Sequence, residues 1–492
     1  MTAAKTRRFF VQNFGCRATQ ADGAALAGDL TRRGLAPADD SRAADVVILN
    51  TCTVTAEADQ DARQAIRRIH RENPAAEILV TGCYAQRSPD VLSQLDGVKW
   101  VVGNSHKTLI GDVLAPVSKT PPAAPIPALV QIEGQRGTGG LAYHGEIALG
   151  GTLVGAFSRD TSFLADPVVE AGKDRSRPNL KIQDGCHNRC TFCIIPAVRG
   201  PSRSAPAERV LAQVADLAAR YPEIVLTGIN LGRWGRDLPG RPRLAGLLRR
   251  ILAETALSRL RLSSVEPMDW TDDLLVLMAS SERIAKHIHI PLQSASDNVL
   301  RAMHRRYRAR HYAGRLEKAR GAMPWAAIGA DVMVGFPGET EDDFEATRSF
   351  VERMPFTYLH VFSYSQREST PAAEMRGQVP KAVKKHRNRI LRELIARKNL
   401  HFRRSLLGRP LSAVTLDRRE AGRTLALTDN YVHVEIGGVT IEPGKLVRVE
   451  LVDAGVDKTT ARLARTIGQL ATTTAQLATT TAPLTKTTAT VA

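Results

Sequence analysis

The chain has 492 residues, which is enough for several domains, each with its own buried core. Lys and Arg number 68 against 50 Asp and Glu, a formal net charge of +18, and this excess predicts a polyanionic partner. A hydrophobic fraction of 43% argues against global disorder, and no run approaches the ~18 apolar residues of a membrane span. The first residues contain too short an apolar run for a signal peptide, so we expect a cytoplasmic protein without a membrane partner.

Residues 1–115 alternate strand-like and helix-like stretches. Three β-branched or aromatic runs end at Phe14, Thr51 and Gly82, and a helix-compatible segment follows each of them. Residues 57–72 begin acidic and end basic, which suits a helix dipole, and an Asn-Pro pair follows as a stop. The pattern predicts an α/β domain with a parallel sheet.

Residues 116–178 are rich first in Pro and then in Gly, and we interpret them as a linker or insertion with at most one small hairpin. The GTGG sequence at 137–140 has no Lys-Ser/Thr after it and no clear strand before it. A linker is therefore favoured over a phosphate loop.

Residues 179–380 again alternate between strands and amphipathic helices. Candidate strands lie at 180–184, 223–230, 260–266, 287–293, 328–336 and 358–365. A helix that starts near Ser204 presents one apolar face, formed by Val210, Leu211, Val214, Leu217 and Ala218. Six strands, each followed by a helix or loop, predict a parallel (β/α) barrel or partial barrel.

The rest of the chain divides into three segments. Residues 381–404 carry ten Lys or Arg and one Glu, half of the chain's net charge, and are predicted to form a connecting helix. Its apolar stripe consists of Ile390, Leu391, Leu394 and Ile395. Residues 405–468 contain short β-type runs and predict a small all-β barrel, whereas residues 469–492 repeat QLATTTA and are expected to be a disordered tail.

The six cysteines are too few for a disulfide scaffold and fall into two groups of three. Cys186, Cys190 and Cys193 form a CxxxCxxC array after the first predicted barrel strand. A structural zinc ion would require a fourth ligand, and the adjacent His187 is poorly placed for it. A cubane iron–sulfur cluster with three cysteines keeps one iron open for a small molecule, so the array favours a cluster.

The array, with Phe192 before its last cysteine, resembles the signature of the radical S-adenosylmethionine superfamily. The resemblance implies a [4Fe–4S] cluster whose open iron is chelated by the amino and carboxylate groups of S-adenosylmethionine. It also implies reductive cleavage of that cofactor to a 5′-deoxyadenosyl radical, which a barrel would shield from water.

The other three cysteines, Cys16, Cys52 and Cys83, each follow the carboxyl end of a predicted strand. Such positions meet at one edge of a parallel sheet, so we expect a single three-cysteine site there. A second cluster is the favoured interpretation, and structural thiols or zinc are the alternatives.

The whole arrangement, over about residues 7–465, resembles the radical S-adenosylmethionine methylthiotransferases, and within them most closely the MtaB type, which acts on N6-threonylcarbamoyladenosine in tRNA. The motifs that carry the resemblance are KIQDGCHNRCTFCIIPAVRGPSRS, LTGINLG, LSSVEP, HIPLQSASDNVLRAMHRRY, DVMVGFPGETEDDF and FSYSQREST. Two positions depart from the family pattern: Thr19 replaces an Asn, and Ser369 replaces a Gly.

The resemblance implies an enzyme that methylthiolates C2 of N6-threonylcarbamoyladenosine at position 37 of tRNA. It would use two [4Fe–4S] clusters, with S-adenosylmethionine as radical source and methyl donor. The anticodon loop would be the partner, the terminal barrel would be a TRAM-like RNA-binding module, and an unidentified reductant and sulfur donor would take part. Alternatives are action on N6-isopentenyladenosine or on a ribosomal-protein Asp, or a non-catalytic zinc-containing RNA-binding protein.

Residues beyond the cysteines carry weaker signals. The candidate cofactor contacts are Phe192, Gly228 and Glu266. Gly228 would allow close approach of the backbone to a ligand, with a plain strand-end turn as the alternative. Glu266 follows a predicted strand and would bond the ribose of the cofactor, with a surface or paired carboxylate as the alternative. Asp331 begins a predicted strand and is interpreted as a structural cap, and His287 and His289 as core or rim histidines.

Clustered positive charge predicts the RNA-binding surface. The residues proposed for it, beside helix 381–404 and the terminal barrel, are Arg301, Arg305, Arg306, Arg308, Arg310 and Tyr307.

Overall fold

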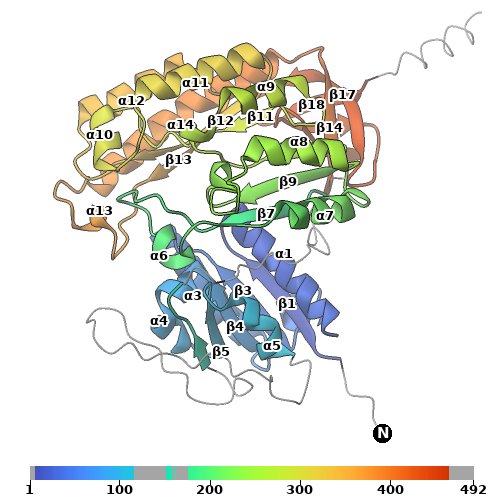
Figure 1. The fold of residues 1–492 in the computed structure, drawn as a ribbon, viewed down its shortest axis with the longest axis vertical. Helices are drawn as coiled ribbons and strands as arrows, with labels where there is room; N and C mark the ends of the chain where they lie inside the picture. Colours follow the sequence, from blue (N-terminus) through green and yellow to red (C-terminus); the bar gives the residue numbers. More distant parts are fainter. Residues whose placement is uncertain (1–5, 116–150, 158–160, 162–175, 421, 465–492) are drawn as a thin grey trace, which may run out of the picture.

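The computed structural model describes residues 6–115, 151–157, 161, 176–420 and 422–464, which form three packed parts (Figure 1). Within these residues, none of the helices combines the length and the apolar character that a membrane crossing needs. The Thr-rich segment 469–492 and the GTGG sequence lie outside the described residues.

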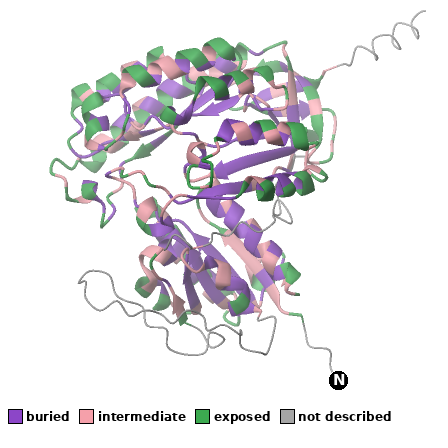
Figure 2. Cartoon of the chain, in the orientation of Figure 1, coloured by how far each residue is buried: buried purple, intermediate pink, exposed green. Residues whose placement is uncertain are grey.

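The first part is a parallel six-stranded sheet. Its strands are β1 (Arg8–Asn13), β2 (Ala36–Pro37), β3 (Val46–Thr51), β4 (Glu77–Gly82), β5 (Val98–Gly103) and β6 (Gly151–Leu153), in the order β2-β1-β3-β4-β5-β6. Every residue of β3 is buried, because helices cover both faces of the sheet (Figure 2). The predicted parallel α/β fold is confirmed. The strand β6, within the predicted linker, pairs in parallel with β5 and extends the sheet rather than forming a hairpin.

The helices of this part follow the strands in sequence. They are α1 (Arg17–Arg32), α2 (Ala56–Glu72), α3 (Cys83–Arg87), α4 (Pro89–Ser93) and α5 (Ile110–Leu114), with 3-10 turns η1 (Ser41–Ala43) and η2 (Lys107–Leu109). Helix α2 matches the predicted range: the Thr55 hydroxyl accepts a hydrogen bond from the Ala58 amide at its start, and the helix ends at Glu72.

The second part is a partial barrel of parallel strands. Its strands are β7 (Asn179–Asp184), β8 (Arg203–Ser204), β9 (Glu223–Gly228), β10 (Arg259–Leu262), β11 (His287–His289), β12 (Ala327–Val334) and β13 (Tyr358–Ser363). They form two sheets, β10-β9-β7-β8 and β11-β12-β13, and an isolated bridge joins Leu260 of β10 to Ile284, three residues before β11. All six predicted strands are present, and only the short β8 runs antiparallel to its neighbour.

The helices of the second part are α6 (Ile195–Arg199), α7 (Ala207–Ala218), α8 (Leu244–Glu254), α9 (Asp272–Ser280), α10 (Asp297–Ala302), α11 (Ala309–Ala322), α12 (Glu341–Arg353), α13 (Pro371–Glu374) and α14 (Lys381–Arg404), with 3-10 turns η4 (Leu231–Arg233) and η5 (Pro267–Asp269). The longer helices of this part, such as α8, α11 and α12, lie on the outside of the barrel, whereas α6 lies at the junction with the first part (Figure 1). Helix α7 buries the predicted Val210, Leu211, Val214 and Leu217, whereas Ser204 belongs to β8 and the helix begins three residues later.

Helix α14 docks on the barrel through its apolar stripe, with Leu391, Leu394 and Ile395 buried as predicted. Its positive charge is only partly free. The Arg387 guanidinium pairs with the Glu339 carboxylate at 2.7 Å, and the Lys398 ammonium donates to backbone carbonyls. The helix therefore uses some of its cations to fasten the fold and presents the others to solvent.

The third part is a closed five-stranded barrel, as predicted for an all-β module. Its strands are β14 (Pro410–Glu420), β15 (Arg423–Thr428), β16 (His433–Gly437), β17 (Leu446–Ala454) and β18 (Thr459–Leu463), closed in the order β14-β15-β16-β18-β17. Closure leaves no free sheet edge.

A fully buried carboxylate connects this barrel to the second part. Glu223 accepts hydrogen bonds from Arg259 Nε (2.6 Å) and Arg261 Nε (2.8 Å). The same two guanidinium groups donate to the carbonyls of Ser412 and Asp429 in the terminal barrel, both at 3.0 Å. Burial alone raises the pKa of Glu223, but the surrounding arginines outweigh it and hold that pKa well below its usual range.

Replacing this carboxylate, Glu223→Gln, should lower the free energy of unfolding by about 3–5 kcal/mol, because the buried arginines lose their counter-charge. Thermal or urea unfolding measures the change. The matched control is Glu208→Gln, which removes an ion pair to Arg250 whose carboxylate side is 76% exposed, and it should change stability by less than about 1 kcal/mol. Equal melting temperatures for the two variants would contradict the account.

Candidate functional site

The first three cysteines meet at the carboxyl edge of the N-terminal sheet. Cys16 caps α1 directly after β1, Cys52 follows β3, and Cys83 begins α3 directly after β4. Gly15 has φ 106°, and a Cβ at this position would lie 2.7 Å from Cys52 Cβ, so glycine allows the two loops to touch. The predicted convergence of the three strand ends is confirmed.

The surroundings of these thiols suit a bound cationic centre. Burial, with the neighbouring Cys83 and Cys16, raises the pKa of the Cys52 thiol to about 12. The Asn104 amide and the Arg199 Nε donate to Cys83 Sγ at 3.4 and 3.3 Å. A metal centre deprotonates such thiols, and the two donors then stabilise the thiolate.

The second three cysteines lie in the loop between β7 and α6. Gly185, with φ 71°, begins this loop, and a Cβ there would lie only 1.9 Å from the Pro201 carbonyl oxygen. Thr191 anchors the loop, since its amide donates to the Met303 carbonyl and its carbonyl accepts from Ala372. The backbone path is therefore closely specified before any ligand binds.

Hydrogen-bond donors also surround the sulfurs of this loop. The Asn188 amide donates to Cys186 Sγ at 3.3 Å, and Arg305 Nη1 donates to Cys190 Sγ at 3.4 Å. Burial, followed by Cys190 and Cys186, raises the pKa of Cys193 to about 12. Three thiols with donors aimed at sulfur fit an iron–sulfur cluster.

The distances between the sulfur atoms can be compared with those expected around a single zinc ion. Thiolates bound to tetrahedral zinc at ~2.3 Å lie about 3.8 Å from one another. In the part of the chain that is described, one group of three ligand-type side chains has all its donor atoms within 4.8 Å, and it consists of His289, Asp331 and His360. In the described residues, the sulfur atoms of neither cysteine set all lie within 4.8 Å of one another.

A row of polar side chains extends across the barrel from the loop that carries Cys186, Cys190 and Cys193. The Glu266 carboxylate pairs with Arg305, which also contacts Cys190. Asp331 lies in the same row, 3.5 Å from His289 Nε2. It stands in the middle of β12 and not at its start, so the prediction of a strand cap is wrong.

The candidate cofactor contacts outside the cysteines have different surroundings. Phe192 packs on an apolar cluster that includes Met303 and Phe336. Gly228 lies against the Gln183 side chain, where an added Cβ would be 2.9 Å from Gln183 Oε1. Contacts of Phe192, Gly228 and Glu266 with a cofactor stay predictions.

The two histidines on β11 are buried, as predicted. His287 Nε2 lies 2.6 Å from the Tyr358 hydroxyl, and the His287 ring stacks on Tyr431 at 4.2 Å between centroids. Burial is the main reason that the pKa of His289 falls to about 3. Both rings are therefore neutral at physiological pH.

Arg199 is a central residue that sequence reasoning missed. It is 1% exposed, and it belongs to an ionic network that connects the first two parts. Arg199 Nη1 contacts both Asp184 oxygens at 3.0 and 3.1 Å, and Nη2 contacts Asp22 at 3.2 Å. Lys107 and Lys181 complete the network by pairing with Asp22. In the sequence, the one feature that points to Arg199 is its position in PAVRG, shortly after the last cysteine of the CxxxCxxC array.

The two residues that depart from the family pattern have defined surroundings. Thr19 is fully buried and keeps a hydrogen-bonding oxygen, which accepts from Arg199 Nη2 at 3.3 Å. Ser369 has φ 69°, the left-handed region that favours glycine. Two residues earlier, Arg367 pairs with Asp59 of α2 at 2.6 Å, so the FSYSQREST segment fastens the barrel to the N-terminal part.

The predicted RNA surface needs a correction. Tyr307 is 3% exposed and donates to the Leu292 carbonyl at 2.6 Å. Arg305, whose side chain is 5% exposed, is held by Glu266. Both were assigned to the surface on charge and composition alone, but their partners lie inside the barrel. Arg301, Arg306 and Arg310 are exposed.

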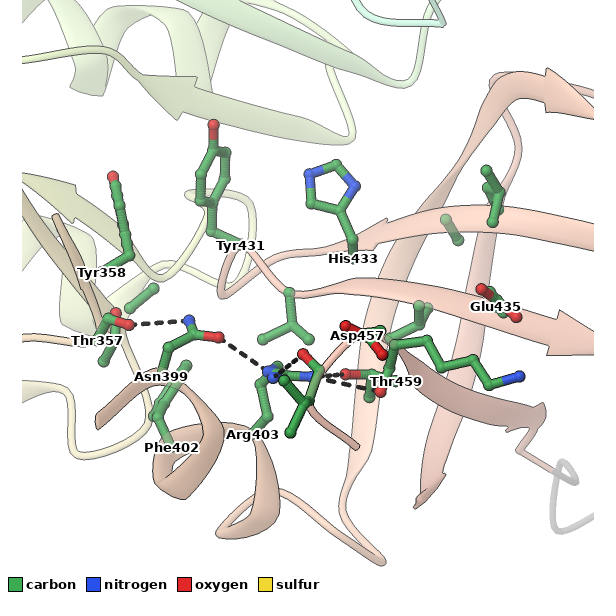
Figure 3. Close-up of a pocket in the computed structure, with 17 residues that line it drawn as sticks. Thr357, Tyr358, Asn399, Phe402, Arg403, Tyr431, His433, Glu435, Asp457 and Thr459 are labelled. Atoms are coloured by element: carbon green, nitrogen blue, oxygen red, sulfur yellow. Dashed lines mark hydrogen bonds between the residues drawn. The ribbon is translucent and has the colours of Figure 1, made fainter. Parts of the chain in front are cut away.

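A separate pocket of about 390 Å³ lies between α14, β13 and the terminal barrel (Figure 3). Tyr358, Tyr431 and His433 line one side of it. Arg403 on the other side donates to the Gly455 carbonyl and the Thr459 hydroxyl, both at 2.8 Å. None of the cysteines lines the pocket, which belongs to the junction of the barrel with α14.

The ionic network predicts a large cost for Asp22→Asn. This isosteric change leaves three buried cations against one carboxylate, and we expect a loss of about 3–5 kcal/mol in unfolding free energy. Limited proteolysis should also cut the junction between the first two parts sooner. Asp216→Asn, which removes an exposed pair with Arg220, is the control and should behave like the parent chain. Unchanged stability of Asp22→Asn would contradict the role of the network.

Asp331 predicts a distinctive dependence of stability on pH. Burial, followed by the Glu266 carboxylate, raises its pKa to about 7 against the opposing effect of Arg305, and His289 and His360 also face it. The folded chain therefore keeps a proton that the unfolded chain releases above its lower pKa. Stability from this group is complete below about pH 4 and is lost as the pH rises to about 7.

Asp331→Asn should remove this contribution, so the stability difference between the parent chain and the variant should change by roughly 2–4 kcal/mol over that interval. Urea unfolding at several pH values measures it. A difference that does not change with pH would show that Asp331 ionises normally.

Comparisons with known proteins follow the same division of the chain. Residues 8–103 match the model described as "Uncharacterized protein family UPF0004", and residues 180–351 match the Radical SAM superfamily. Among solved structures, the radical S-adenosylmethionine methyltransferase TsrM from Kitasatospora setae, with cobalamin and a [4Fe-4S] cluster bound, is similar in fold. Its TM-score is 0.51 at 16% identity, covering 75% of this chain and 77% of that one.

Curated relatives span nearly the whole chain. The threonylcarbamoyladenosine tRNA methylthiotransferase MtaB of Bacillus subtilis (strain 168) is 36% identical, over 90% of this chain and 93% of that protein. The tRNA-2-methylthio-N(6)-dimethylallyladenosine synthase of Mycobacterium ulcerans (strain Agy99) is 35% identical, over 91% and 82%. With this identity over almost the full length, and with two three-cysteine sites in the geometry described, the chain belongs to the radical S-adenosylmethionine methylthiotransferase family.

Proposed function

We propose that this protein methylthiolates C2 of N6-threonylcarbamoyladenosine at position 37 of tRNA. The observation that carries the proposal is the junction of two three-cysteine sites, one on the N-terminal sheet and one on the barrel. Arg199 at the end of α6 touches Cys83, and only six residues (199 − 193) separate it from Cys193. A helical segment of that length spans about 9 Å. A substrate carbon between the sites is thus within reach of both.

Each cysteine set has its own role in the proposal. Cys186, Cys190 and Cys193 hold a [4Fe–4S] cluster with one iron open to S-adenosylmethionine, and Cys16, Cys52 and Cys83 hold a second [4Fe–4S] cluster. When bound, the first supplies radical chemistry from S-adenosylmethionine, which also provides the methyl group, and the second supplies a site for sulfur transfer.

The residues of the chain orient this chemistry. Asn188, Asn230 and Arg305 donate hydrogen bonds to sulfur and stabilise its negative charge. Glu266, which Arg305 holds, would accept a hydrogen bond from a cofactor hydroxyl. The barrel walls exclude water from the reacting atoms.

The RNA partner in this proposal is the anticodon loop. An unpaired loop base leaves its stack at small energetic cost and can enter the open side of the barrel. The exposed cations of α14 and the TRAM-like terminal barrel would contact the phosphates. A reductant and a sulfur donor of the cytoplasm complete the reaction.

The relatives also support a second substrate. Dimethylallyladenosine synthases share nearly the same identity with this chain, so N6-isopentenyladenosine is the competing substrate.

Nucleoside mass spectrometry of tRNA from a strain lacking the gene separates the two substrates. We expect loss of 2-methylthio-threonylcarbamoyladenosine, with its precursor accumulating and the isopentenyl analogue unchanged. The parent gene should restore the product, whereas Cys52→Ala should not, because one ligand of the second cluster is missing. Loss of the isopentenyl product instead would overturn the substrate assignment.

A further inference from the structure

Arg17 joins the first and third parts of the chain and, through Tyr431, reaches the second. It is the first residue of α1 and directly follows Cys16. Its Nη2 donates a 3.0 Å hydrogen bond to the hydroxyl of Tyr431, which lies between β15 and β16 of the terminal barrel. Tyr431 in turn stacks on His287 of β11. The guanidinium group is therefore held between the first part and the terminal barrel, on a residue adjacent to a candidate cluster ligand.

Among the residues that the structure describes, no carboxylate forms an ion pair with Arg17. Burial and the nearby Arg17 charge both lower the pKa of the His360 imidazole. His360 therefore stays neutral and does not add to the positive charge around Arg17. Among the described residues, the contacts of Arg17 are the Tyr431 hydroxyl and ring, whereas Arg305 and Arg199 at the same site are paired with carboxylates. A half-buried cation without a carboxylate partner is suited to an anionic group of a ligand.

Aromatic rings lead from the open edge of the barrel to this cation. Phe362, 46% exposed, lies 6.4 Å from His360, and His360 lies 5.5 Å from Tyr358, measured between centroids. Tyr358 lies 5.3 Å from Tyr431. Such a ladder offers flat faces to a purine that has left its stack.

The proposed substrate carries a carboxylate on its N6 group, on the same side of the purine ring as the reacting carbon C2. In the purine ring, C2 and C6 flank the same nitrogen, N1, so a group on N6 lies next to the carbon that reacts. The threonylcarbamoyl group ends in a carboxylate, whereas an isopentenyl group has no charge. When C2 approaches the cysteine set that contains Cys16, the N6 arm is within a side chain's length of Arg17. The planar guanidinium fork matches a carboxylate in two hydrogen bonds.

We propose that Arg17 binds the threonyl carboxylate of the substrate and, with Tyr431 holding its guanidinium in place, selects carboxylate-bearing adenosines. This inference rests on the proposed function and adds the residue that reads the N6 group.

The test compares two anticodon stem-loop RNAs, one with N6-threonylcarbamoyladenosine and one with its neutral threonine methyl ester, on the anaerobically reconstituted holoenzyme. Arg17→Gln should lower kcat/KM on the acid roughly 10- to 100-fold, the range of a charge-assisted contact. It should change the ester by less than about twofold, and Arg17→Lys should recover part of the loss. Arg32→Gln, on the exposed end of α1, is the matched control and should leave both rates unchanged.

Two further measurements keep the outcomes distinct. Iron, labile sulfide and the electron paramagnetic resonance signal of Arg17→Gln should equal those of the parent chain, which separates carboxylate recognition from damage to the cluster beside Cys16. An equal loss on acid and ester would overturn the inference, because Arg17 would then act on the RNA or the cluster. A parent enzyme that modifies only isopentenyladenosine would instead overturn the proposed function itself.

Discussion

The arrangement of this protein depends on one buried ionic network, centred on Arg199 and Asp22. Three cations and two carboxylates from different segments of the chain meet where water is excluded. Buried charges are tolerated only when each has its partners, so separating the N-terminal sheet from the barrel would leave several of them uncompensated. The network therefore keeps the two cysteine sets at a constant separation. Its excess positive charge also lies beside Cys83, where the thiolate of a bound cluster would add negative charge.

The other junctions constrain the same space from different sides. Asp59 and Arg367 fasten α2 to the segment after β13, and Glu223 fastens the terminal barrel to the bottom of β9 and β10. Arg17 of α1 bonds Tyr431 of the terminal barrel. Three parts built from separate runs of sequence are thus fastened to one another, and the proposed radical cleavage and sulfur transfer would require their sites to lie close together.

The sequence was sufficient for the architecture and for the cysteines because both follow from short-range patterns. Alternating apolar runs predicted the strands, and parallel strands bring their carboxyl ends together, which placed Cys16, Cys52 and Cys83 at one edge. The buried partners of Arg199 could not be predicted from the sequence. One of them, Cys83, is 116 residues away, and a charged residue considered by itself is expected to lie in solvent. The same limit explains Arg305 and Tyr307, which were assigned to the RNA surface but bond inside the barrel.

The central claim is that two clusters with separate tasks share one substrate. Iron and sulfide content, together with 5′-deoxyadenosine and methylthiolated product, should be measured on the reconstituted parent chain and on two triple Ala variants, one for each cysteine set. The account predicts about eight irons in the parent and about four in each variant. The variant at Cys186, Cys190 and Cys193 should form no 5′-deoxyadenosine, whereas the variant at Cys16, Cys52 and Cys83 should form it without methylthiolating RNA. Full iron content, or methylthiolated RNA, from the latter variant would contradict the account.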